Sequence, residues 1–297
     1  MTLHFVSGLP RAGSTLLCNI LAQNPRFHAT ATSGILEMLF QVRNGWDKVV
    51  EFRAMDDRQS KATKQRVLAA MLTAYFADVD RPVVFDKSRG WLAHLEMAEA
   101  LLGYRPKVLV PVRDLRDVLA SFERLWRQTA AMGQTADEAA NYQGYQLLEN
   151  RLDMWTGNNG PVGMAYNRIK DALDRGWGAQ MHFVRYDVLT AKPAETMAGV
   201  YRFLGEPAFS HDFEHVEQVT SEDDRVYGFD GLHTIRAQVR PQTLHRNWRF
   251  QSLPNPLSGP VEFHRMPLNH HCSPKLWLGS QALLFQQYHS WQWVLDR

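Results

Sequence analysis

The sequence predicts an α/β fold, a parallel sheet flanked by helices on both faces, with a partly irregular C-terminal extension. Three observations lead to this prediction. Short apolar runs alternate with longer stretches of helical periodicity, a glycine-containing loop joins the first run to the first helix, and the alternation weakens beyond Glu206-Pro207. Alternating strands and helices are typical of parallel sheets with right-handed crossovers.

The elements can be placed in order along the chain. Strands are expected at the apolar runs 3–6, 82–85, 107–112 and 181–184. Helices are expected at 14–23, 35–77, 91–102, 115–125, 136–175, 195–204 and 279–293. Proline cannot donate a ladder hydrogen bond, so Pro111 is placed among the last residues of its strand. We expect one domain over residues 1–297, with a core to about 205 and a lid-like extension over 206–297.

Composition excludes several classes of protein. Hydrophobic residues make up 45% and charged residues 22% of the 297 residues, and no apolar run approaches the length of about 20 residues that a membrane helix needs. The formal net charge of +2 is too small to indicate nucleic acid or a membrane surface as partner. Cys18 and Cys272 have neither disulfide-framework nor zinc spacing, and His264, His270 and His271 do not complete a tetrahedral set. No secretory signal is seen, so we expect a cytoplasmic protein. We also expect that it needs no metal, and the sequence does not determine its oligomeric state.

The loop after the first strand, in the stretch LHFVSGLPRAGSTLL, has the chemistry of an anion site. Gly8 and Gly13 have the spacing of a P-loop, G-x-x-x-x-G, and Thr15 stands at its hydroxyl position. Ser14 replaces the lysine that nucleotide-hydrolysing loops require, and Arg11 supplies a cation inside the turn. Backbone N–H groups, hydroxyls and the positive end of the following helix favour a phosphate-like group without metal. The alternative is an ordinary tight turn.

A second candidate anion site follows the strand 107–112. Arg113 leaves the carboxyl end of that strand, and Ser121 lies eight residues further on, along the next helix. Ligands of doubly wound sheets bind at this edge, so both side chains could meet a second phosphate. The alternative is that residues 113–117 only cap and charge the start of the helix.

Together, the two motifs resemble those of sulfotransferases that use 3′-phosphoadenosine-5′-phosphosulfate (PAPS). LPRAGSTLL is similar to that family's 5′-phosphosulfate loop, and Arg113-x7-Ser121 to its 3′-phosphate motif, over residues 3–125. A weaker match at Val184-Arg-Tyr-Asp187 would place Tyr186 beside the adenine. The residues that the resemblance places on the nucleotide are Arg11, Ala12, Gly13, Ser14, Thr15, Arg113, Ser121, Tyr186, Ser221 and Arg236. The bacterial and tyrosylprotein-type branches are the most similar.

The resemblance implies transfer of a sulfuryl group from PAPS, without metal, to a hydroxyl or amine of a small molecule or peptide side chain. Arg11 would grip the departing phosphate, and Lys87 would be the cation on the bridging oxygen. Fixed donors can stabilise such charge electrostatically.

Two carboxylates compete for the role of general base. Asp86 lies at a strand end, but Lys87 and Arg89 would hold its pKa low. Glu37 follows the first helix beside apolar residues that could raise its pKa. We expect Glu37 to be the base and Asp86 to orient Lys87, and structural salt bridges are equally compatible with the sequence. If Glu37 is not the base, Asp86 or a histidine such as His233 is the candidate.

Two other functions stay open. An ATP-dependent small-molecule or nucleoside kinase would use magnesium, against which Ser14 in place of lysine argues. A noncatalytic nucleotide-binding protein would keep the loop without a base. Binding of 3′,5′-ADP or of ATP, with and without magnesium, would separate these possibilities.

Overall fold

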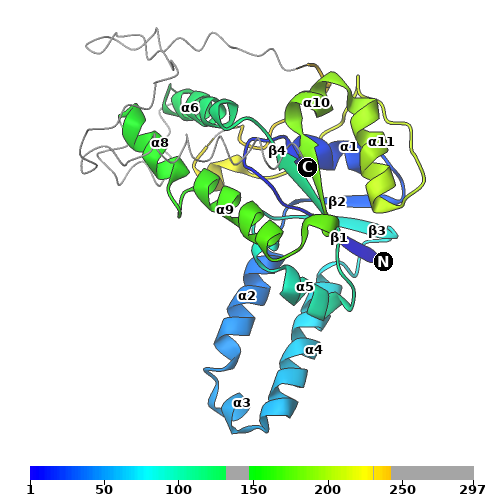
Figure 1. The fold of residues 1–297 in the computed structure, drawn as a ribbon, viewed down its shortest axis with the longest axis vertical. Coiled ribbons are helices and arrows are strands. Elements are labelled where there is room, and N and C mark those ends of the chain that lie inside the picture. Colours follow the sequence, from blue (N-terminus) through cyan, green and yellow to red (C-terminus); the bar gives the residue numbers. More distant parts are fainter. Residues whose placement is uncertain (132–146, 230, 242–297) are drawn as a thin grey trace, which may run out of the picture. The chain divides into compact units, whose positions relative to one another are not determined.

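A five-stranded sheet forms the centre of the computed structural model, which describes residues 1–131, 147–229 and 231–241. Its strands pair in the order β2-β3-β1-β4-β5, and every pair is parallel (Figure 1). The strands are β1 Thr2–Val6, β2 Phe27–Thr32, β3 Val83–Lys87, β4 Val108–Val112 and β5 Met181–Arg185. The fold class predicted from the sequence is confirmed.

Strand β2 was not predicted. Its sequence, FHATAT, buries only Phe27 and Ala29, and it pairs on one side only, with β3. An edge strand has a neighbouring strand on one side only, so fewer of its side chains are covered and its sequence can be more polar. The short run therefore lacks the pattern by which the four other strands could be found.

Helices fill the crossovers between these strands. They are α1 Ser14–Ala22, α2 Ile35–Trp46, α3 Val50–Ala54, α4 Asp57–Tyr75, α5 Leu95–Leu102, α6 Leu115–Ala131, α8 Leu148–Thr156, α9 Pro161–Asp174, α10 Tyr186–Ala191 and α11 Pro193–Leu204, with short 3₁₀ turns η1 Trp91–Ala93, η3 Gly178–Gln180 and η4 Asp224–Tyr227. The stretch 35–77, expected as one helix, is three helices. The third begins where the side chain of Asp56 accepts a hydrogen bond from the Gln59 N–H at 3.0 Å.

The core lies on both faces of the sheet. On one face, Leu17 and Ile20 of α1 and Val200 of α11 pack against strand residues such as Phe85. On the other face, the ring of Phe5 stacks on Trp91 with their centroids 3.9 Å apart. Figure 1 shows α1, α10 and α11 on one side of the strands and α5 and α9 on the other.

The ends of β1 and β4 approach closely at Gly8 and Pro111. The Leu9 N–H donates to the Pro111 carbonyl at 2.9 Å, and a Cβ on Gly8 would lie 2.3 Å from that oxygen. The pairing of β1 with β4 covers only Val108 and Leu109, so Pro111 lies beyond the ladder on that side. This agrees with its expected place near the end of the strand and explains why position 8 has no side chain.

Beyond α11 the described chain is irregular apart from η4. It returns to the core, where the Val216 N–H donates to Ala237 O at 2.6 Å and the Val239 N–H to Phe213 O at 2.8 Å. Val216 and Val239 are buried in the same cluster as α1 and α11. The expected helix 279–293 and part of the stretch 136–175 lie outside the described residues, and a single domain over 1–297 stays a prediction. Among the described helices, none is long and apolar enough to span a membrane.

Candidate active site

The loop between β1 and α1 turns through two left-handed residues. Arg11 has φ 57° and Gly13 has φ 82°. A Cβ on Gly13 would lie 2.5 Å from Cδ2 of Tyr186, which begins α10 and packs against the loop. Gly13 is also the N-cap of α1 and brings no side chain to its first turn. The positive end of α1 is therefore presented by backbone N–H groups, as an anion site requires.

Two arginines and a hydroxyl gather on one side of this loop. Arg113 Nη1 donates to Arg11 O at 3.0 Å, and Arg11 Nε donates to Ser121 Oγ at 3.1 Å. The guanidinium of Arg113 lies 4.6 Å from the centroid of the Tyr186 ring. The structure thus joins Arg11 to Ser121, although the sequence had suggested that they serve different phosphates.

Neither arginine is neutralised fully. Burial, and then the charge of Arg113, lower the pKa of Arg11, which still stays charged because guanidinium is a very weak acid. Arg113 Nε is buried and finds no hydrogen-bond partner among the described residues, and the nearest carboxylate oxygen, Oδ2 of Asp117, is 4.0 Å away. A buried donor without a partner costs about 1–3 kcal/mol. An anion bound here would remove that cost.

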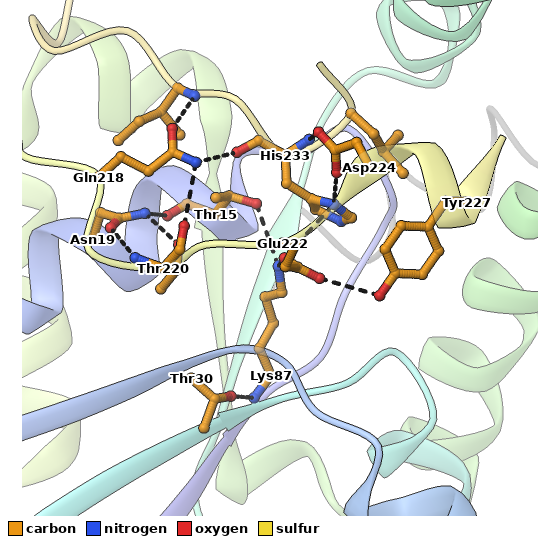
Figure 2. Close-up of polar contacts among 12 residues, drawn as sticks. Thr15, Asn19, Thr30, Lys87, Gln218, Thr220, Glu222, Asp224, Tyr227 and His233 are labelled. Carbon is orange, nitrogen blue, oxygen red and sulfur yellow. Dashed lines mark hydrogen bonds and ion pairs between the residues drawn. The ribbon is translucent and has the colours of Figure 1, made fainter. Parts of the chain in front are cut away.

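Lys87 supplies a cation on the other side of the loop. It is the last residue of β3, and its Nζ lies 3.4 Å from Thr15 Oγ1 in the first turn of α1. The same Nζ lies 3.1 Å from Oε2 of Glu222, and both side chains are less than 10% exposed (Figure 2). Lys87 therefore connects the loop with a segment more than a hundred residues further along the chain.

Residues 218–229 and 231–235, called the strap below, are held against α1 by hydrogen bonds. Asn19 Oδ1 accepts from the N–H groups of Val219 and Thr220 at 2.6 and 3.0 Å, and its Nδ2 donates to Thr220 Oγ1 at 2.8 Å. Gln218 Nε2 donates to the carbonyls of Thr220 and His233, both at 3.2 Å. Figure 2 shows these contacts beside Lys87. The Leu232 carbonyl also accepts a hydrogen bond from Arg11 Nη1.

The strap brings together a cluster of ionisable side chains, of which the sequence had offered only His233, as a fallback base. Glu222 Oε1 accepts from Tyr227 Oη at 3.3 Å, and Glu222 Oε2 lies 3.6 Å from His233 Nδ1. His233 Nδ1 lies 2.6 Å from Oδ1 of Asp224. Ser221 and Arg236 were the nucleotide contacts expected from this region. The acidic run SEDD and the following histidine were visible signals, but nothing in their spacing shows which of them turn inward.

The charges in this cluster affect one another. Burial raises the pKa of the Glu222 carboxyl, but the hydrogen bond from Thr32 and the charge of Lys87 outweigh it and leave the pKa below its ordinary value. Burial, followed by the charge of Lys87, lowers the pKa of His233, and the hydrogen bond to Asp224 opposes this. Glu222 is consequently an anion bound to Lys87, and His233 is a neutral imidazole at neutral pH.

A family model with the description "Sulfotransferase family" matches residues 4–211, more than half of the chain. The chain belongs to the sulfotransferase family. The match spans the loop, both arginines and Lys87, so it covers the predicted motifs. Whether this sulfotransferase belongs to the bacterial and tyrosylprotein-like branch stays a prediction. A search of curated proteins returned no match.

Solved structures similar to this sulfotransferase include three bacterial or biosynthetic domains. The sulfotransferase domain from the Synechococcus PCC 7002 olefin synthase is 17% identical with a TM-score of 0.55, and the match covers 98% of this chain and 94% of that one. The sulfotransferase domain from the curacin biosynthetic pathway is 19% identical with a TM-score of 0.49, and the match covers 86% of this chain and 93% of that one. The sulfotransferase from Alicyclobacillus acidocaldarius is 15% identical with a TM-score of 0.45, and the match covers 76% of this chain and 88% of that one. At 17% identity, the first likeness establishes the fold.

The two expected base candidates of this sulfotransferase lie apart from Lys87 Nζ. Glu37 is exposed in the first turn of α2, where Oε1 accepts from Gln41 Nε2 at 3.0 Å. Asp86 is fully buried and accepts from Trp91 Nε1 at 2.7 Å and Thr30 Oγ1 at 3.2 Å. Successive strand residues point to opposite faces, so Asp86 and Lys87 point apart.

The expectation that Lys87 and Arg89 would hold the pKa of Asp86 low is wrong. Burial raises the pKa of the Asp86 carboxyl, and the hydrogen bonds from Trp91, Ser33 and Thr30 counteract this only in part. The roles of Glu37 and Asp86 in catalysis stay predictions, as do those of Ser221 and Arg236, which are exposed.

The described part of this sulfotransferase contains no group of three or more His, Cys, Asp or Glu side chains that could hold a metal ion. The histidines at 264, 270 and 271 and Cys272, considered in the sequence, lie outside the described residues.

Proposed function

We propose that this sulfotransferase uses PAPS as donor and transfers its sulfuryl group to a hydroxyl or amine of a small molecule or a peptide side chain. One observation carries the proposal: cationic groups lie on both sides of the N-terminus of α1. Lys87 and Thr15 lie on one side, and Arg11, Arg113 and Ser121 on the other. A nucleotide with anionic groups at both its 5′ and 3′ positions matches this double arrangement.

The loop residues would hold the 5′-phosphosulfate. Backbone N–H groups of the first turn of α1 and the Thr15 hydroxyl donate hydrogen bonds, each charge-assisted one contributing about 1.5–3 kcal/mol. Lys87 stabilises the negative charge that develops on the bridging oxygen when the bond to sulfur breaks. Because β3 and α1 already hold these donors in place, little reorganisation is needed as the charge develops.

Arg11, Arg113 and Ser121 would hold the 3′-phosphate. Nε of Arg113 is the strongest support, since it is a buried donor without a hydrogen-bond partner among the described residues. Tyr186 packs beside Arg113 and Gly13, and we expect the adenine to lie next to its ring. This proposal places Arg11 at the 3′-phosphate, whereas the sequence led us to expect it at the departing 5′-phosphate.

Binding of 3′,5′-ADP tests the proposal. By calorimetry without metal, we expect 3′,5′-ADP to bind and ADP without the 3′-phosphate to bind far more weakly. The variant Arg113→Ala should lose a charge-assisted hydrogen bond, so its affinity for 3′,5′-ADP should fall roughly 10- to 150-fold, and its affinity for ADP much less. Arg53→Ala, an exposed arginine of α3, is the matched control.

Two outcomes would contradict the proposal. Equal affinity for both nucleotides would remove the 3′-phosphate site. Preferential binding of ATP that depends on magnesium would favour the kinase. A direct assay then follows the transfer of radiolabelled sulfate from PAPS to a panel of alcohols, phenols and amines.

A further inference from the structure

We propose that Glu222 competes with the nucleotide for Lys87: in the nucleotide-free protein the strap holds this carboxylate on the lysine, and the bound donor displaces it. The inference rests on the proposed function and deepens it by naming how access to the site is controlled. It depends on three features of the strap: the ion pair itself, a second contact of the strap with Arg11, and the exposure of the turn that follows Glu222.

The first feature is that a carboxylate lies where the proposed donor needs to place its 5′-phosphosulfate. Glu222 Oε2 lies 3.1 Å from Lys87 Nζ, and the same Nζ lies 3.4 Å from Thr15 Oγ1 in the first turn of α1. The side chains of Glu222 and Lys87 are only 6% and 7% exposed. A buried ammonium group without a counter-ion is strongly destabilising. The strap therefore supplies the anion that Lys87 needs when no nucleotide is bound.

The groups that face Glu222 supply too little positive charge for two anions. They are Lys87 from β3, Thr32 from β2, and Tyr227 and His233 from the strap. Among these described neighbours, Lys87 is the one that is positively charged, since His233 is neutral at neutral pH. A phosphosulfate bound to Lys87 adds negative charge beside the carboxylate, and like charges this close repel each other. We therefore expect one anion at a time on Lys87.

The second feature is a contact of the same strap on the other side of the loop. The Leu232 carbonyl accepts a hydrogen bond from Arg11 Nη1, and Arg11 Nε donates to Ser121 Oγ at 3.1 Å. Arg11 belongs to the proposed 3′-phosphate site. The strap thus takes up a donor in each of the two anion sites, Lys87 through Glu222 and Arg11 through Leu232. A nucleotide that fills both sites competes with the strap at two points.

The third feature is that Glu222 lies between a fixed part of the strap and an exposed one. Thr220 is buried and bonded to Asn19 of α1 through its hydroxyl and its N–H. Turn η4 follows, and all but its first residue are exposed. Tyr227 Oη donates to Glu222 Oε1 at 3.3 Å, so the carboxylate lies between Lys87 and a tyrosine that is 45% exposed (Figure 2). Glu222 can therefore leave the lysine toward solvent while the start of the strap stays on α1.

A different role for Glu222 would be to hold Lys87 in place throughout the reaction. The two roles predict effects of opposite sign. If Glu222 holds the lysine, removing its charge weakens nucleotide binding. If it competes, removing the charge strengthens binding, because the donor no longer has to break an ion pair before it reaches Lys87.

Calorimetry with the variant Glu222→Gln decides between the two roles. We expect its affinity for 3′,5′-ADP to rise roughly 10- to 150-fold, which corresponds to one charge-assisted hydrogen bond that need not be broken. Adenosine 3′-phosphate lacks the group that meets Lys87, so its affinity should change little. The matched control is Glu217→Gln, which removes an exposed carboxylate just before the strap and should leave both affinities unchanged.

A double-mutant cycle separates competition for Lys87 from plain repulsion between Glu222 and the nucleotide. In a Lys87→Ala background, Glu222→Gln should raise the affinity for 3′,5′-ADP by about twofold or less, because there is no lysine left to compete for. Plain repulsion would survive the loss of the lysine and give the same gain in both backgrounds. Urea unfolding checks that each variant is folded.

A crystal structure of the wild type with 3′,5′-ADP tests the inference without a variant. We expect the 5′-phosphate beside Lys87 Nζ, and Glu222 Oε2 more than about 4 Å from that nitrogen, beyond the distance of an ion pair. A complex in which Glu222 is still paired with Lys87 would overturn the inference.

The outcomes separate the two proposals. If 3′,5′-ADP binds the wild type but binds Glu222→Gln no more tightly, or if the gain is equal in the Lys87→Ala background, the inference about Glu222 is overturned and the proposed function stands. If 3′,5′-ADP binds neither the wild type nor Glu222→Gln, the proposed function fails, and the inference with it.

Discussion

Four charged side chains at or beside the site, two buried and two half-buried, are compensated in different ways. Lys87 has Glu222 as a counter-ion, and Asp86 has hydrogen bonds from Trp91 and Thr30. Arg11 donates to two neutral oxygens, and the buried Nε–H of Arg113 has no hydrogen-bond acceptor among the described residues. Uncompensated buried donors are rare in folded proteins. The arginines are therefore the residues whose environment improves most when an anion binds.

The raised pKa of Asp86 predicts how the stability of the protein depends on pH. Its pKa in the folded protein is raised, so the folded state binds the proton more tightly than the unfolded state. This contribution to stability is complete below the ordinary aspartate pKa of about 3.9 and is lost as pH rises through the raised folded value. Asp86→Asn removes the titration and keeps an acceptor for Trp91. Relative to this variant, the wild type should lose free energy of unfolding as pH increases.

Urea unfolding between about pH 4 and pH 8 measures this difference. Asp78→Asn, which replaces an exposed carboxyl, is the control. A difference between wild type and Asp86→Asn that is constant with pH would show that the buried carboxyl is ionised throughout. Sulfuryl transfer by Asp86→Asn, measured in parallel, reports on the expected role of Asp86 in orienting Lys87.

At the scale of elements, the site depends on how the loop meets its neighbours. Gly8 lets the end of β1 approach Pro111, and Gly13 lets α1 begin against the ring of Tyr186. The strap then closes on α1 through Asn19, whose side chain bonds three groups of residues 219 and 220. Short, fixed connections of this kind hold donors more rigidly than a free loop would.

Gly13→Ala is predicted to destabilise the protein for two separable reasons. The left-handed backbone costs an alanine about 1–2 kcal/mol, and the added Cβ would lie 2.5 Å from the Tyr186 ring. Gly103 has a similar φ of 76° with nothing within 4 Å of its Cβ position, so Gly103→Ala should show only the first cost. Unfolding in urea should rank Gly13→Ala well below Gly103→Ala in stability.

The double variant Gly13→Ala/Tyr186→Ala completes this comparison. Against Tyr186→Ala as reference, the cost of Gly13→Ala should fall to that of Gly103→Ala, because the ring is gone and only backbone strain is left. If the cost of Gly13→Ala does not depend on Tyr186, the packing of α10 against the loop is not as described.

At the scale of the whole molecule, the strand order places the site. Strand β1 has β3 on one side and β4 on the other. The crossovers before β4 add strands to one side of β1 and those from β4 onward add them to the other, so the strand order switches between β1 and β4. Ligands of open α/β sheets bind outside the carboxyl ends of strands at such a point. The loop after β1 and Arg113 after β4 lie at this junction, and Lys87 ends the neighbouring strand β3. Residues about a hundred positions apart in the sequence therefore become neighbours.

A buried ion pair joins two helices that are distant in the sequence. Glu123 of α6 binds Arg151 of α8 through Oε2–Nε at 2.9 Å and Oε1–Nη2 at 2.7 Å, and both side chains are less than 5% exposed. Glu123→Gln should lower the free energy of unfolding by about 3–5 kcal/mol, because it removes the carboxylate charge that faces the buried guanidinium of Arg151. The measurement is urea unfolding at neutral pH.

Arg127 provides the matched comparison for that pair. It also binds Glu123 Oε1, at 2.6 Å, but its side chain is 39% exposed. Arg127→Met should therefore cost about 1 kcal/mol or less. Equal effects of the two variants would mean that α6 and α8 are not coupled through a buried charge.

Local sequence was sufficient for much of the fold and part of the site. Four strands, the loop with Gly13 and Thr15, and the places of Lys87 and Arg113 at strand ends followed from apolar runs and short motifs. These features depend on backbone geometry and on neighbours within a few residues, which a sequence displays directly. Membership in the sulfotransferase family followed from the same motifs.

Only the tertiary structure decided the rest. Edge strand β2 exists because β3 offers it a partner, and Asp86 is a buried acid because Trp91 and Thr30 cover it. The cluster of Glu222, Asp224 and His233 meets Lys87 across more than 130 residues. Burial and pKa are properties of what surrounds a side chain in space, and for these residues the surroundings come from distant segments that no local pattern records.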